Sequence, residues 1–336
     1  MLGLLLVVLS ALGVSACDEI NPDLSAALQP QDLAIVVNTN DPLSIRIGEY
    51  YRDRRRIPAR NWIEIELPTH RSSVSPSEFR KIRREVERQT RVGVQAYALT
   101  WAEPYRVGCM SITAAFALGF DEKYCSEGCV ATAPSPYFNQ DSGAPYRDFG
   151  LRPTMAIAAT SFPKARDLIE RGIRSDYDRP QGTAYLLSTS DVPRNARAAN
   201  YATVLAAVPD FAIEQIQADK LENKRDVMFY FTGLAQVENI RSNRFLPGAV
   251  ADHLTSFGGM LTDSSQMSSL RWLEAGATGS YGTVTEPCNY TQKFPHPAVL
   301  LHHYRRGDTL IEAYWKSVAW PGQGMFIGEP LAKPFR

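Results

Sequence analysis

A histidine and a cysteine in the last third of the chain have the types expected of a catalytic base and its nucleophile. His253 and Cys288 each stand near the end of an apolar run rich in small residues, GAVADHLTSFGG and GATGSYGTV. A cysteine attacks as the thiolate, and a neighbouring imidazole can lower the thiol pKa and later protonate the leaving group. If the two side chains meet, the pair predicts a cysteine hydrolase.

Other residues offer weaker chemistry. Ser256 and Ser280 are candidate nucleophiles, but neither is surrounded by the Gly-x-Ser-x-Gly motif. A predicted helix carries His296, His302 and His303, yet no acidic residue follows at the spacing of a metal ligand. The glycine pairs lack the Lys of a phosphate-binding loop. The sequence therefore predicts neither a metal nor a cofactor.

Three apolar runs end in Glu-Pro, at Glu103, Glu286 and Glu329. Proline cannot donate to a β-ladder, so each pair marks the end of a strand. If these strands are parallel neighbours, the three carboxylates gather at one sheet edge, with Trp320 and Ser256 beside them. Such an edge would form a polar pocket for a ligand amine, a cation or a proton. The simpler interpretation is that each Glu-Pro pair only ends a strand and that its carboxylate is exposed to solvent.

Strand and helix patterns alternate along most of the chain and would position these groups. Apolar runs of strand length occupy 33–38, 62–67, 94–101, 154–160, 183–189, 213–219, 227–233, 248–259, 276–284 and 325–331. Helical patterns lie between many of them, at 43–56, 75–90, 163–173 and 195–207. This rhythm predicts an α/β fold: a doubly wound, mostly parallel sheet with helices on both faces.

The rhythm breaks over 105–152, which is rich in Pro, Gly and Asn and holds three cysteines. We interpret this segment as an insertion or long ordered loop within a single domain over 32–336. Four cysteines remain when Cys17 is set aside, and an even number in an exported chain predicts disulfides with three possible pairings. Cys125 and Cys129 share one loop and could close a small ring, which would leave Cys109 to pair with Cys288.

The first sixteen residues are an uncharged apolar run that ends in small residues, as in a secretory signal peptide. The junction Val14-Ser15-Ala16-Cys17 resembles the bacterial lipoprotein box, although no Lys or Arg precedes the run. Residues 17–31 would then tether the domain to a lipid on Cys17. The prediction is an exported protein anchored to the bacterial cell membrane and facing the periplasm. The alternative is an ordinary signal peptide with an incidental cysteine.

The overall composition excludes one class of partner. The chain is 44% hydrophobic and 21% charged, and its 36 Lys and Arg balance 36 Asp and Glu. A balanced chain of this kind buries a large core and has no electrostatic footprint for nucleic acid.

The segments DHLTSFGG (252–259), GATGSYGTVTEPC (276–288) and SVAWPGQGMFIGEPLAKPF (317–335) resemble an uncharacterised family of exported bacterial proteins. That family occurs in genomes carrying exosortase, a membrane enzyme proposed to sort surface proteins. The resemblance implies an accessory role in an envelope or exopolymer system, with an envelope polypeptide or glycan as the partner.

The order of elements also has a remoter resemblance to the caspase-like fold of gingipain-type cysteine peptidases. In those enzymes a strand ending in His-Gly precedes a strand ending near the catalytic Cys. Here the corresponding positions hold Thr232-Gly233 and Thr255-Ser256. This resemblance implies a peptidase-like fold that lacks the usual dyad, and it leaves Cys288 and His253 as the alternative pair.

Overall fold

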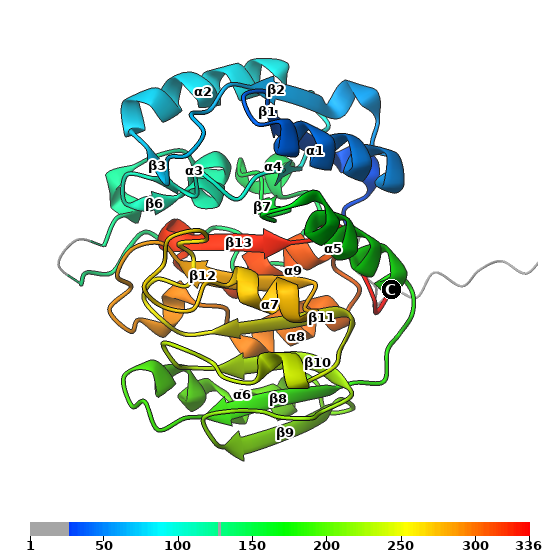
Figure 1. The fold of residues 1–336 in the computed structure, drawn as a ribbon, viewed down its shortest axis with the longest axis vertical. Helices are drawn as coiled ribbons and strands as arrows, with labels where there is room; N and C mark the ends of the chain where they lie inside the picture. Colours follow the sequence, from blue (N-terminus) through cyan, green and yellow to red (C-terminus); the bar gives the residue numbers. More distant parts are fainter. Residues whose placement is uncertain (1–26, 127–128) are drawn as a thin grey trace, which may run out of the picture.

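The computed structural model describes residues 27–126 and 129–336; the signal segment, Cys17 and most of the predicted tether lie outside them. A ten-stranded sheet runs through the molecule and confirms the predicted α/β fold (Figure 1). Across the sheet the strands are β2 (Trp62–Ile65), β1 (Leu33–Asn38), β4 (Ala96–Leu99), β7 (Thr154–Ala156), β13 (Gly324–Gly328), β12 (Gly279–Thr283), β11 (Phe245–His253), β10 (Val227–Thr232), β8 (Thr183–Ser188) and β9 (Ala212–Gln217).

Strand β13 lies in the middle of the sheet and runs antiparallel to its neighbour β12. The register of this pair runs from Gly279 opposite Gly328 to Thr283 opposite Gly324. In Figure 1, β13 accordingly points against β11 and β10. The carboxyl ends of β4, β11 and β12 lie at one edge, where Tyr105 reaches Asp263 and Thr285 reaches Cys109. Strand β13 ends at the opposite edge, beside the C-terminal ends of α1 (Pro42–Arg55) and α5 (Phe162–Ser175).

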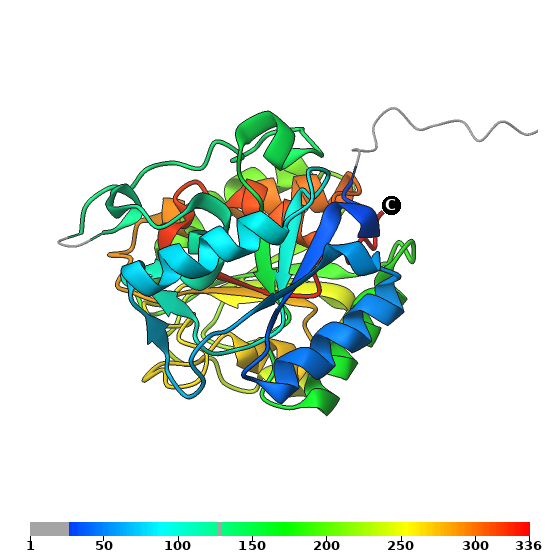
Figure 2. The same ribbon diagram turned by 90° about the horizontal axis from the view of Figure 1, so that it is seen from above.

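Helices cover both faces, as the strand–helix rhythm predicted. They are α1 (Pro42–Arg55), α2 (Pro76–Gln89), α3 (Ile112–Leu118), α4 (Pro145–Phe149), α5 (Phe162–Ser175), α6 (Ala202–Ala207), α7 (Leu270–Ala275), α8 (Pro297–Arg305) and α9 (Leu310–Ser317). Seen from above, α1 and α5 lie on one side of the sheet and α2 on the other (Figure 2). Because both faces are covered, every residue of β1 and of β10 is buried.

The helix starts follow from local sequence. Asp41 caps α1, where its carboxylate accepts the amide N–H of Leu43 at 2.9 Å. Ser75 and Glu78 form a reciprocal capping box at the start of α2. Both helices have proline in the first turn, where no amide donor is needed. These short-range signals are why the helix positions could be predicted from the sequence.

The segment expected as an insertion contributes directly to the main fold. Its strands β5 (Arg106–Val107) and β6 (Met110–Ser111) join β3 (Ser73–Val74) in a small second sheet. Helix α3 then packs on β7 and β13. At its start the Ser111 hydroxyl donates to the carbonyl of Gly324 at 2.5 Å, and Thr113 Oγ1 accepts the amide of Phe326 at 3.2 Å. The segment thus satisfies the part of β13 that β7 does not pair.

Within residues 27–126 and 129–336, no helix is both long enough and apolar enough to cross a membrane.

Candidate functional site

All four cysteines of the folded domain form disulfides, but in a different pairing from the expected one. Cys109 is bonded to Cys125 and Cys129 to Cys288, with Cα–Cα distances of 5.5 and 5.4 Å. The expected Cys125–Cys129 ring does not form, because the loop that carries both residues reaches two different segments. Tyr290 donates its hydroxyl to the carbonyl of Cys129 at 2.9 Å, beside the loop that carries Cys288.

The proposed Cys288–His253 dyad is therefore wrong. Cys288 has no free thiol because its sulfur is bonded to Cys129. His253 is the last residue of β11, is fully buried, and contacts Trp272 and Met267. Without a thiolate there is no nucleophile for the imidazole to activate.

The hydrogen bonds of His253 fix it as a neutral structural residue. The indole N–H of Trp272 donates to Nδ1 at 2.9 Å, so Nε2 carries the proton and donates to the carbonyl of Met267 at 3.0 Å. Burial lowers the pKa of His253 to about 3. Both ring nitrogens are in use, and the ring is held uncharged at neutral pH.

Of the two candidate serines, Ser280 is held in the interior and Ser256 is part-exposed. Ser280 is fully buried on β12, and its hydroxyl has no hydrogen-bond partner among the described residues. Ser256 follows β11, where its carbonyl accepts the hydroxyl of Thr283 at 2.8 Å. No contact joins either hydroxyl to a general base among the described residues, so the structure gives no support to a serine nucleophile.

Thr232 and Thr255, at the two positions that the peptidase resemblance singled out, are covered by arginines from the segment after β8. Arg197 donates to the carbonyl of Thr232 at 3.0 Å, and Arg194 Nε donates to the hydroxyl of Thr255 at 3.1 Å. Thr255 donates in turn to Gln266 at 2.7 Å. Thr232 and Thr255 are each 1% exposed. This part of the edge is packed with side chains.

A buried ion pair lies beneath that edge. Arg197 NH1 contacts the Asp252 carboxylate at 2.5 Å, and both side chains are 1% exposed. Burial raises the pKa of Asp252, and the charge of Arg197 only partly offsets this effect. The sequence carries no local signal for this pair, because Arg197 follows β8 and Asp252 lies on β11.

The three Glu-Pro carboxylates do not gather, and the prediction of a shared acidic pocket is wrong. Because β13 runs antiparallel to β12, Glu329 and Glu286 leave the sheet at opposite edges. Glu103 is part-exposed, and Tyr105, two residues further on, donates its hydroxyl to Asp263 in the loops beyond β11. Glu286 lines an open hollow.

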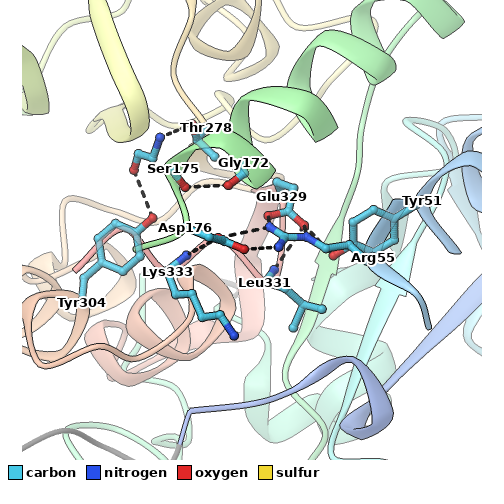
Figure 3. Close-up of polar contacts among 11 residues, drawn as sticks. Tyr51, Arg55, Gly172, Ser175, Asp176, Thr278, Tyr304, Glu329, Leu331 and Lys333 are labelled. Atoms are coloured by element: carbon cyan, nitrogen blue, oxygen red, sulfur yellow. Dashed lines mark hydrogen bonds and ion pairs between the residues drawn. The ribbon is translucent and has the colours of Figure 1, made fainter. Parts of the chain in front are cut away.

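Glu329 belongs to a buried cluster that joins three elements (Figure 3). Its carboxylate accepts the hydroxyl of Tyr51 at 2.6 Å and Nε of Arg55 at 2.9 Å, both from α1. Arg55 also pairs with Asp176 at the end of α5. The carboxylate is fully buried and its neighbours occupy its oxygens, so this glutamate serves the structure and not a ligand.

Glu286 borders a hollow of about 410 Å³ at the carboxyl end of β12. We call it the disulfide hollow, and it is lined chiefly by Arg106, Cys109, Cys129, Thr285, Glu286 and Cys288. Both disulfides brace it, and Thr285 Oγ1 donates to the carbonyl of Cys109 at 3.1 Å across it. The hollow therefore has a rigid wall with one acidic and one basic side chain on it.

An aromatic pair adjoins the disulfide hollow. Trp320 and Tyr290 are part-exposed, and their ring centroids are 5.4 Å apart. Tyr290 reaches the hollow through its bond to the carbonyl of Cys129. The sequence pointed to Trp320 and Glu286, whereas Tyr290 and Arg106 were missed. Their proximity depends on the cross-link between Cys129 and Cys288.

Lys293 adds an ionisable amine beside this pair. Its Nζ lies 5.0 Å from the centroid of the Tyr290 ring and 3.4 Å from the carbonyl of Val130. Burial lowers the pKa of Lys293 to about 8, and the carboxylate of Glu286 opposes the shift. A small fraction of this amine is thus neutral at physiological pH.

The three helical histidines do not converge on a metal. His296 precedes α8 and its side chain makes no capping hydrogen bond, whereas His303 contacts Asp308 at 3.2 Å and Asn139 at 3.1 Å. His302 packs edge-on against His303. In the part of the chain that the structure describes, no three His, Cys, Asp or Glu side chains are grouped to hold a metal ion.

Comparison with known proteins adds no assignment: no family model, no curated protein and no solved structure matches this chain.

Proposed function

We propose that this protein is an extracytoplasmic, lipid-anchored binding protein that takes a glycan in the disulfide hollow and has no hydrolytic activity. It would act as an accessory of an exosortase-linked envelope or exopolymer system. The observation that carries the proposal is the Cys129–Cys288 disulfide, which removes the candidate nucleophile and builds the wall of the hollow.

The absence of catalysis is supported by what surrounds each candidate group. The sulfur of Cys288 is bonded, the imidazole of His253 is fixed between Trp272 and Met267, and Thr255 is sealed by Arg194. A nucleophile and a base within hydrogen-bond reach are the minimum for covalent hydrolysis. None of these side chains meets that condition.

The side chains around the hollow favour a glycan over an extended polypeptide. Sugar rings present apolar faces to aromatic side chains and hydroxyl groups to charged ones, and sites of this kind combine aromatic surface with few polar groups. Trp320 and Tyr290 provide the aromatic surface, and Glu286 and Arg106 provide an acceptor and a donor. A polypeptide would be favoured by a free strand edge, whereas β12 is paired on both sides.

The location outside the cytoplasm is supported by the two disulfides, which persist in oxidising compartments. The lipid anchor rests on the sequence around Cys17, which lies outside the described residues. The link to exosortase rests on the family resemblance of the segments 252–259, 276–288 and 317–335.

The experiment is a binding titration of the purified full chain with a panel of neutral, amino- and uronic-acid hexasaccharides, followed by tryptophan fluorescence. We expect saturable binding that Trp320→Ala weakens by about tenfold, the loss of one good stacking contact. The matched control is Trp62→Ala, because Trp62 is also part-exposed but lies on β2 at the far end of the sheet.

Equal losses in both tryptophan variants, or no binding to any oligosaccharide, would overturn the glycan proposal. A parallel assay with fluorogenic peptides tests the absence of hydrolysis. Peptide turnover by the parent that disappears in the Cys288→Ser variant would support the alternative of a cysteine hydrolase.

A further inference from the structure

A second hollow lies between α5 and α7, on the face of the sheet opposite α2. We call it the α5–α7 hollow; its volume is about 410 Å³ and it shares no lining residue with the disulfide hollow. Its apolar lining comes from the residues after β7 and from both helices: Ala158, Ala159, Leu168, Leu270 and Leu273. Sites for small organic molecules have volumes of about 300–1,000 Å³ and mostly apolar walls.

The polar side of the α5–α7 hollow carries more positive than negative charge. Glu274 is 8% exposed and lies 2.7 Å from Lys164 Nζ, 2.6 Å from Arg271 NH1 and 3.8 Å from Arg241 NH2. One carboxylate cannot neutralise three cations. The other acid in the lining is Asp167, so the lining itself holds three cations, with Arg171 counted, against two carboxylates. The excess charge attracts an anion.

Two of these cations retain donors for a ligand. The contact of Arg241 with Glu274 is longer than a hydrogen bond, and the Arg241 side chain is 74% exposed. Lys164 uses its ammonium on Glu274 and on the hydroxyl of Thr160, and its side chain is 47% exposed. A guanidinium and an ammonium on one rim are the groups that hold carboxylates and phosphates.

A fourth cation lies deeper in the lining. Arg171 donates to the carbonyls of Leu273 at 3.1 Å and Ala277 at 2.6 Å, and so holds the end of α7. Its Nε is buried and has no hydrogen-bond partner among the described residues. Burial, together with the charge of Arg174, lowers the pKa of Arg171 to about 10. A nearby anion would offset this loss of solvation.

We propose that the α5–α7 hollow binds an amphiphilic organic anion, with its carboxylate or phosphate at Lys164 and Arg241 and a short hydrocarbon chain against Ala158, Ala159 and Leu270. The apolar lining favours a ligand with a hydrocarbon chain, and the cations of the rim favour a ligand with a negative charge. This site shares no lining residue with the proposed glycan site, so each proposal can be tested without the other.

The test is isothermal titration calorimetry of the full chain, kept in solution with a neutral detergent. Four probes separate the two requirements: hexyl phosphate, hexanoate, inorganic phosphate and hexanol. We expect hexyl phosphate and hexanoate to bind, and hexanol and inorganic phosphate to bind at least about tenfold more weakly. Equal affinity for inorganic phosphate and hexyl phosphate would overturn the amphiphile.

Variants place the binding in the hollow. Arg241→Gln and Lys164→Gln should each weaken hexyl phosphate by about five- to tenfold, since each removes a charge-assisted contact. Ala275→Leu, which fills the hollow from a part-exposed position of α7, should weaken hexyl phosphate and hexanoate alike.

The matched control is Arg80→Gln, the same loss of charge at an exposed position of α2. It should bind hexyl phosphate as the parent does. The proposal is overturned by an equal loss in the Arg80→Gln variant, by unchanged affinity in the Arg241→Gln variant, or by no heat of binding up to about 10 mM probe.

Discussion

Arg55 on α1 and Glu329 after β13 form a buried, two-pronged ion pair that fastens the first helix of the domain to its last strand. The residues are 274 positions apart in sequence. Tyr51 and Asp176 complete the cluster (Figure 3). It therefore joins α1 and α5 to β13, in the middle of the ten-stranded sheet.

Removing one partner of this pair should destabilise the fold severely. Glu329→Gln leaves the guanidinium of Arg55 with only Asp176, and we expect a loss of about 3–5 kcal/mol in the free energy of unfolding. Arg54→Gln is the control, because Arg54 pairs with Glu170 at a more exposed site and should cost no more than about 1 kcal/mol. Urea denaturation measures both. Similar losses in the two variants would contradict the structural role of the cluster.

The two disulfides should contribute unequally to stability. The Cys129–Cys288 bridge closes a separation of 159 residues and the Cys109–Cys125 bridge one of 16. Chain-entropy arguments give about 5 kcal/mol for the longer loop and about 3 kcal/mol for the shorter. Guanidinium unfolding of the two double-serine variants tests the order. The oxidised parent should also show no cysteine labelling in the folded domain, and a label on Cys288 would contradict the pairing.

Acid should destabilise the protein in part through His253. The pKa of His253 is lowered to about 3 in the fold, so the unfolded chain takes up a proton that the folded one excludes. The corresponding stability is fully present above the ordinary histidine pKa of about 6.5 and is lost as the pH falls toward 3, at about 1.4 kcal/mol per pH unit.

The His253→Gln variant should be less stable at neutral pH, because it loses the ring contact with Trp272 and the hydrogen bond that Nδ1 accepts from it. It should also show a flatter pH dependence between pH 6 and 4. His70→Gln is the control, since His70 is exposed. Thermal unfolding across this pH range measures the difference. A parent and a His253→Gln variant with parallel profiles would show that the imidazole titrates freely in the fold.

If Cys17 carries a lipid anchor, a single substitution should release the protein from the membrane fraction. Cys17→Ser removes the thioether-bearing residue, and the chain should move from the membrane pellet to the soluble fraction after cell breakage. Asp18→Ala keeps Cys17 and should remain in the pellet. Immunoblots of both fractions measure the outcome. A Cys17→Ser chain that stays in the pellet after a high-pH wash would argue against lipidation.

Several features of the fold could be predicted because their signals are local. The apolar run of 33–38 is strand β1, and the Ser75–Glu78 box starts α2. Glu286 and Trp320 were expected near an edge pocket because Pro and Gly residues around them end regular structure. Glu286 does line the disulfide hollow, and Trp320 adjoins it.

The sequence by itself determined the α/β alternation, the strand positions and the presence of disulfides, since propensity, capping and cysteine number act over a few residues. Only the tertiary structure decided that β13 runs against β12, that Cys288 bonds to Cys129, and that His253 is enclosed by Trp272. Each of these depends on residues far apart in the chain, and a local pattern carries no information about strand direction or about which distant group fills the space beside a side chain.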